Sequence, residues 1–213
     1  MLVAALSAVV LAGCGNPASP AAPNATPTTT AAAPAASTVH NAADVAFVQA
    51  MIPHHAQAIA MSQFAEQRAT SPQVKQLATQ ISQAQGPEIA QMQAMLQSWG
   101  LPAQPTSSAG TSGTTGMNGM NGGSTSATPG ASGTSGMPGM MSDQQMQQLS
   151  AATGTAFDRM FLQMMIQHHT GAVDMSQTEL RDGQNPDAKA LAQKIIDAQR
   201  AEITQMQQLL TTI

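Results

Sequence analysis

Apolar residues recur at steps of three and four along two stretches of the chain, as the buried face of an amphipathic helix requires. In the first stretch this spacing runs over about 42–68 and again over about 73–98. Ser71-Pro72 separates the two runs, and a Ser followed by Pro at the first helical position is a typical helix start. The pattern therefore predicts a pair of helices joined by a short turn.

The second stretch repeats the first at a constant offset of 114 residues, the separation of His54 from His168. Asn185-Pro186 supplies the same helix-start signal there. The offset holds without a gap for Asp44/Asp158, Phe47/Phe161, Met51/Met165, His55/His169, Met61/Met175, Leu77/Leu191, Ile81/Ile195, Glu88/Glu202, Met92/Met206 and Leu96/Leu210. Such a match indicates a duplicated unit, and two αα-hairpins predict an all-α fold, a four-helix bundle.

The two hairpins occupy residues 41–101 and 142–213, and the segments outside them have the composition of linkers. Residues 15–40 are dominated by Pro, Ala and Thr and carry no charge, whereas residues 102–141 are rich in Gly, Ser, Thr and Met. Such segments bury too little apolar surface to order themselves, and they are typical of a stalk and a flexible linker. We therefore expect the hairpins to form one bundle, with residues 102–141 connecting its halves.

The N-terminus reads MLVAALSAVVLAGCGN, a short apolar segment that ends in Leu11-Ala12-Gly13-Cys14 and resembles a bacterial lipobox. Cys14 is the only cysteine, so a disulfide within the chain is excluded and lipidation accounts for its presence. We expect residues 1–14 to be a lipoprotein signal peptide, with Cys14 tethering an extracytoplasmic protein to the cell membrane. A plain secretory signal is the alternative.

Composition and charge argue against two kinds of partner. Only 8% of the residues are charged and the net charge is −4, which gives no reason to expect nucleic acid binding. No apolar run reaches the ~20 residues of a membrane-spanning helix. Contact with a membrane is therefore expected through the lipid anchor alone.

Ionisable residues lie on the apolar faces of the predicted helices. At about 100° per residue, His55 and Asp44 fall near the centre of the first face, whereas His54 falls at its edge beside Met61. On the second helix, Glu88 falls in the middle of the apolar stripe. Burying such groups alone is costly, so they need partners.

Helix geometry brings these residues to one height. With a rise of ~1.5 Å per residue from a turn near residue 70, His55 and Glu88 lie within roughly one helical turn of each other. Duplication places the second copy at the same level. The predicted layer contains His55, Glu88, His169 and Glu202, with Met51, Met92, Met165 and Met206 beside it. Two His and two Glu that converge by duplication favour a metal site over ordinary core packing.

Further candidate ligands lie around this layer. His54 and His168 are expected at its rim, and Met61, Met175, Asp44 and Asp158 share the same faces. The linker adds methionines in a polar setting with no core to fill: Met117, Met120, Met137, Met140 and Met141. Thioethers suit soft Cu(I), while imidazole and carboxylate also accept Cu(II). Copper is therefore the predicted ion, with another transition metal as the alternative.

The paired segments F-x3-M-I-x-H-H-x2-A-x2-M-S, each followed by E-I-x-Q-M, resemble the bacterial secreted family catalogued as domain of unknown function 305. The resemblance implies a ferritin-like four-helix bundle and, for some members, extracytoplasmic copper binding and resistance. It points to the histidine pairs at 54–55 and 168–169 and to their accompanying methionines as ligands. The long Met/Gly/Ser insert between the copies departs from compact members.

Three functions compete on this reading. The leading hypothesis is a non-enzymatic, membrane-tethered copper-binding protein for sequestration or delivery, with a protein partner for metal exchange. The second is a di-metal bundle oxidoreductase, although the Glu-x-x-His motif of di-iron bundles is missing from the sequence. The third is a metal-free structural protein of the cell envelope.

Overall fold

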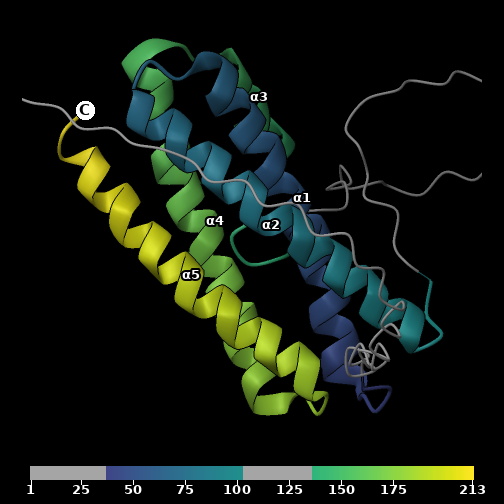
Figure 1. The fold of residues 1–213 in the computed structure, drawn as a ribbon. Helices are drawn as coiled ribbons and strands as arrows, with labels where there is room; N and C mark the ends of the chain where they lie inside the picture. The colour runs from purple at the N-terminus through teal and green to yellow at the C-terminus, as the bar shows by residue number, and fades with distance from the viewer. Residues whose placement is uncertain (1–36, 103–135) are drawn as a thin grey trace, which may run out of the picture. The chain divides into compact units, whose positions relative to one another are not determined.

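Four long helices and one short helix make up the described part of this computed structural model, which covers residues 37–102 and 136–213 (Figure 1). They are α1 (Ala42–Arg68), α2 (Pro72–Ser98), α3 (Asp143–Ala151), α4 (Gly154–Asp182) and α5 (Pro186–Leu210). The prediction of an all-α four-helix bundle is confirmed by α1, α2, α4 and α5. The short helix α3 was not predicted, because its nine residues fell inside the expected second hairpin without a repeat partner.

Several predicted features lie outside the described residues. These are the signal peptide with Cys14, the stalk up to residue 36, and the linker methionines Met117 and Met120. Within residues 37–102 and 136–213, no helix is both long and apolar enough to cross a membrane.

The hairpin turns begin their second helices as the sequence predicted. Ser71 caps α2, its hydroxyl accepting a hydrogen bond from the backbone N–H of Val74, and Asn185 caps α5 through the N–H groups of Asp187 and Ala188. Proline inside a helix removes one backbone hydrogen bond. Nevertheless α1 and α2 continue through Pro53 and Pro87, so neither residue ends a helix.

Two buried aspartates fasten each hairpin to the turn of the other. Asp44, at the start of α1, accepts hydrogen bonds from the backbone N–H groups of Gln184 (3.0 Å) and Asn185 (2.8 Å) in the α4–α5 turn. Asp158, near the start of α4, accepts them from Thr70 N (3.0 Å) and Ser71 N (2.9 Å) in the α1–α2 turn. The start of α1 thus lies beside the end of α4, and the start of α4 lies beside the end of α1. The two helices therefore run antiparallel.

The structure places these two aspartates, named above as candidate metal ligands, at the two ends of the bundle and away from the predicted histidine layer. Asp44 precedes His55 by eleven residues on the same helix, about 16 Å at 1.5 Å per residue. Both carboxylates are engaged by backbone amides at the bundle ends, and Asp44 also closes the capping box of α1 with Asn41. They hold the fold together.

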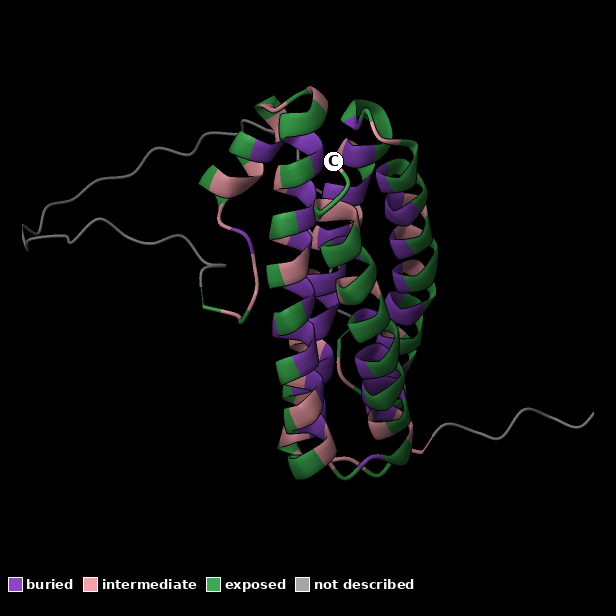
Figure 2. Cartoon of the chain, turned by 90° about the vertical axis from the view of Figure 1, so that its left-hand side faces the viewer, coloured by how far each residue is buried: buried purple, intermediate pink, exposed green. Residues whose placement is uncertain are grey.

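The apolar core is divided into two clusters, one towards each end of the bundle. One is built around Leu77, Ile81, Phe157 and Phe161, and the other around Ile52, Leu96, Leu191 and Ile195. Buried residues line the inward sides of the helices and exposed residues the outward sides (Figure 2). Along each of the four long helices, the polar residue predicted for the layer lies between residues of one cluster and residues of the other.

A second buried acid lies beside the Asp44 clamp. Glu179 on α4 is 1% exposed and faces Asp44, which is fully buried. Burial, together with the neighbouring Asp44 carboxylate, raises the pKa of Glu179 to about 8. For Asp44, burial alone would raise the pKa, but the backbone N–H donors of Asn41 and Asn185 bring it below its usual value. At neutral pH the pair therefore holds one negative charge.

Glu179→Gln should remove a pH dependence of stability. Because the pKa of Glu179 is raised on folding, its contribution is complete below the unfolded value near 4.5 and is lost as pH rises to about 8. Denaturant unfolding of the wild type should show stability falling by up to about 1.4 kcal/mol per pH unit in this window relative to Glu179→Gln. The exposed Glu66→Gln is the control, and parallel profiles for wild type and Glu179→Gln would contradict the assignment.

Candidate metal centre

Four histidines occupy the middle of the bundle, two on α1 and two on α4. His54, His55, His168 and His169 are all fully buried. The two helices cross here as an antiparallel pair, so the duplicated histidines meet across an approximate two-fold axis. The sequence prediction that duplication brings both copies to one layer agrees with this arrangement.

Each second histidine of a pair is hydrogen-bonded to the glutamate on the neighbouring helix. His55 Nε2 lies 2.8 Å from Glu88 Oε2, and His169 Nε2 lies 2.7 Å from Glu202 Oε2. A carboxylate oxygen accepts in such a pair, so each Nε2 is the donor and carries a proton. In the neutral form of either ring, the lone pair is then on Nδ1. The Nδ1 atoms of both histidines are buried without a hydrogen-bond partner.

The first histidine of each pair faces its counterpart directly. The rings of His54 and His168 lie with their centroids 3.8 Å apart and are tilted by 42° to each other. His54 Nε2 donates to the carbonyl of Pro138 at 3.1 Å, whereas neither ring nitrogen of His168 has a partner. The expectation that these two residues lie at the rim is wrong. Because α1 packs against both α2 and α4, its buried face is wider than one stripe.

The electrostatics of the layer favour neutral imidazoles at His54, His55 and His168. Burial lowers the pKa of His54 to about 3, with repulsion from His55 adding to the shift. Burial also lowers the pKa of His55, and burial together with His54 lowers that of His168 well below its usual value. A neutral imidazole offers one nitrogen lone pair, which is the form that binds a metal ion.

Glu88 is held ionised by two neighbours. Burial alone would raise its pKa, but the hydrogen bond from His55 and the charge of Lys194 lower it. Lys194 Nζ, on α5, lies 3.3 Å from Glu88 Oε1. The repeat is asymmetric here, because the position matching Lys194 in the first copy is Gln80.

Sequence reasoning missed a second pair of polar residues in the layer. Gln85 and Gln199 are buried one turn before Glu88 and Glu202, and side-chain amide atoms of both lack hydrogen-bond partners. They obey the same offset of 114 residues, which was the signal that could have identified them. Buried polar atoms without partners are uncommon in folded proteins and call for an explanation.

The predicted methionines line the two sides of this layer. Met51 and Met92 belong to one apolar cluster, while Met61, Met165 and Met206 belong to the other. Met175 is only partly buried. Met137 and Met140 are half-buried, and Met141 is 1% exposed within the core. The expectation that Met141 has no core to fill is therefore wrong.

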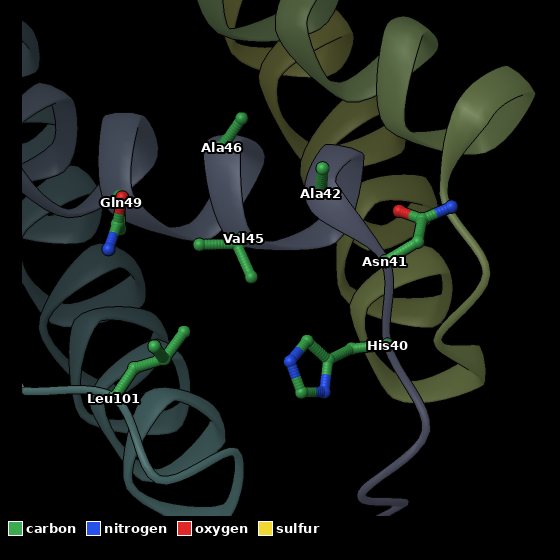
Figure 3. Close-up of a pocket in the computed structure, with 7 residues that line it drawn as sticks. All are labelled: His40, Asn41, Ala42, Val45, Ala46, Gln49 and Leu101. Carbon is green, nitrogen blue, oxygen red and sulfur yellow. The ribbon is translucent and has the colours of Figure 1, made fainter.

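Within the described ranges, no three His, Cys, Asp or Glu side chains gather closely enough to enclose an ion. What the layer contains is pairs of nitrogen donors with thioethers nearby. A hollow with a volume of about 530 Å³ lies elsewhere, at one end of the bundle. Figure 3 shows His40, Val45 and Leu101 lining it. The ring of His40 stacks on Trp99, and this hollow contains none of the predicted ligands.

Solved structures of similar proteins share this fold. A DUF305 fragment from Deinococcus radiodurans is 31% identical, with a TM-score of 0.64 over 81% of this chain and 98% of that one. A DUF305 protein from Streptomyces coelicolor is 29% identical, with a TM-score of 0.63 over 80% and 93% of the two chains.

A third similar structure is that of CopM in its Cu(II)-bound form. It is 33% identical, with a TM-score of 0.60 over 79% of this chain and 96% of that one. CopM has also been solved in Cu(I)-bound, Ag-bound and apo forms. Among curated proteins, no match was found.

The sequence profile of the family described as "Domain of unknown function (DUF305)" matches residues 44–210, from the Asp44 clamp to the end of α5. This range contains both hairpins and the whole histidine layer. The chain therefore belongs to the DUF305 family.

Proposed function

We propose that this protein binds copper without catalysing a reaction, and that it sequesters the ion outside the cytoplasm or delivers it to a partner protein. The observation that carries the proposal is the layer of four fully buried histidines between two apolar clusters. Their ring nitrogens are left without protein partners at Nδ1 of all four and also at Nε2 of His168. An ion bound there would supply the missing partner.

The donors in this layer suit a soft ion. Neutral imidazole nitrogens and thioethers are ligands that Cu(I) accepts, and Cu(I) is stable with few donors. We assign the ligand role to Nδ1 of His55 and His169. Glu88 and Glu202 then orient the rings and raise the basicity of the bound nitrogens from the other side, as carboxylates commonly do for metal-bound histidine.

Similarity to CopM supports copper as the ion. CopM has been solved with Cu(I), Cu(II) and Ag bound, and the present chain is about one third identical to it over most of its length. We extend that binding to this protein because the histidine layer offers nitrogen donors of the kind that copper accepts. The metal ion is here the cargo of the protein.

The lipobox-like sequence supports a position on the cell membrane. If Cys14 is lipidated, the stalk ahead of α1 separates the bundle from the bilayer, and the protein works in the cell envelope. Copper that crosses the envelope would then meet the bundle outside the cytoplasm.

Substituting the two glutamate-linked histidines tests the metal site. His55→Ala with His169→Ala should abolish the tightest uptake of Cu(I) or Ag(I), measured by titration of metal-free protein against a competing chelator. Glu88→Gln with Glu202→Gln should weaken it about 10–100-fold, the usual cost of losing a group that orients a ligand. His40→Ala is the control histidine outside the layer. Unchanged uptake in all variants would refute copper binding at the layer.

His168→Leu should stabilise the metal-free protein. It replaces a buried imidazole that has no hydrogen-bond partner by an apolar side chain, and such a buried polar group costs about 1–3 kcal/mol. Denaturant unfolding should therefore show higher stability without metal. With Ag(I) at roughly 100 times its Kd, the wild type should gain about 2.7 kcal/mol and the variant clearly less. A destabilised metal-free variant would point to a structural role for His168.

Cys14→Ser tests the tether. Without the thiol no lipid can be attached, so the variant should leave the membrane fraction for the soluble or secreted fraction, as followed by immunoblotting of fractionated cells. Retention of Cys14→Ser in the membrane fraction would contradict the lipoprotein assignment.

A further inference from the structure

The segment Gly136–Ser142, here called the strap, lies across α1 and α4 beside the central histidines, near the middle of the bundle (Figure 1). The carbonyl of Pro138 accepts a hydrogen bond from His54 Nε2 at 3.1 Å. Three residues later, the side-chain amide of Gln57 pairs with the backbone of Met141 in both directions. Gln57 Nε2 donates to Met141 O at 2.8 Å, and Met141 N donates to Gln57 Oε1 at 2.7 Å.

Two glycines allow the strap to approach α4 closely. A Cβ on Gly171 would overlap the carbonyl group of Pro138 and the nitrogen of Gly139. A Cβ on Gly139 would lie 2.7 Å from the carbonyl oxygen of His168 and 2.8 Å from that of Gln167, closer than packed atoms come. Gly139 also has a φ of 79°, which favours glycine. The strap is therefore seated on the helix backbone itself.

The repeat breaks its symmetry where the strap is seated. Gln57 and Gly171 are matched positions, separated by the offset of 114 residues. In the first copy, the side chain of Gln57 forms hydrogen bonds with the strap. In the second copy, Gly171 has no side chain and leaves room for the strap. Both departures from the repeat serve the same contact.

The strap also completes a chemical pattern among the histidines. A carbonyl can only accept a hydrogen bond, so His54 Nε2 carries the proton and Nδ1 keeps its lone pair. This is the tautomer that Glu88 imposes on His55 and Glu202 imposes on His169. His168 has no such partner at either nitrogen. The strap thus gives His54 a hydrogen-bond acceptor at Nε2, as Glu88 and Glu202 do for His55 and His169.

We propose that the strap is a positioning element of the metal centre, which sets the tautomer and ring orientation of His54 so that Nδ1 is presented to a soft monovalent ion. The proposal rests on copper binding at the histidine layer. Because coupling between two equilibria is reciprocal, docking of the strap raises ion affinity and a bound ion tightens docking of the strap. Ion binding at His54 and docking of the Met-containing strap are therefore thermodynamically coupled.

Gly171→Ala in the full chain tests this coupling, with Ag(I) alone as the probe. The added methyl group should push the strap off α4, while alanine favours the helix itself. We expect Ag(I) affinity about 10–100-fold weaker, the range for loss of an orienting partner. Nitrogen-15 spectra of the imidazoles should show His54 leaving the single Nε2–H tautomer, a signature that a purely structural role would not produce. Gly86→Ala, where a Cβ meets nothing, is the control.

A second variant and a second measurement protect the test against misfolding. Gln57→Ala removes both hydrogen bonds to Met141 and should weaken Ag(I) binding in the same direction, whereas the exposed Gln63→Ala on the same helix should not. In the wild type, hydrogen exchange at the Met141 amide should slow when Ag(I) is added. The strap role is overturned if undocked variants bind Ag(I) with wild-type affinity, or more tightly, since tighter binding would mean that Pro138 competes with the ion. Failure of the wild type to bind Ag(I) or Cu(I) would instead refute the proposed function itself.

Discussion

Burying four imidazoles with too few hydrogen-bond partners is the constraint on which the rest of this structure depends. Such a layer costs free energy, because five of its eight ring nitrogens lose water without gaining a donor or acceptor: Nδ1 of all four histidines and Nε2 of His168. The apolar clusters on either side must hold it closed. The aspartates at the two bundle ends add to this, since each ties the start of one helix to the turn of the other hairpin. A metal-free bundle of this kind is stable in spite of its centre.

The duplicated pattern was enough to predict the four long helices and the similar height of His55 and Glu88. A constant offset fixes which residues match, and helix rise places matched residues at similar heights. The pattern failed where one helix was considered alone. A helical wheel gives direction around one axis and no height along it, so it put Asp44 on the same face as His55 although the two residues are three turns apart. It also underestimated the burial of His54, whose face is covered by a second neighbouring helix.

Residues outside the repeat could not be reached by that reasoning. Glu179 matches Ala65 in the first copy, so no duplicated signal marks its contact with Asp44. Met141 follows a segment rich in Gly and Ser, and composition alone does not reveal that its side chain enters the core. The Asn41-x-x-Asp44 spacing, in contrast, was a readable capping-box signal, since a short acidic side chain at the third helical position can return to the cap.

The crossed aspartate clamps also determine how the two hairpins associate with each other. In one hairpin alone, the aspartate would lack the turn whose N–H groups it binds, and the turn would lack its carboxylate acceptor. Two identical hairpins would satisfy each other, with the same surface on both partners and a two-fold axis between equivalent histidines. The single unit is therefore self-complementary, and the two hairpins of this chain associate as two copies in a two-fold homodimer do. The strap, seated where Gln57 and Gly171 differ, breaks this equivalence, because a single segment can contact the two halves only in different ways.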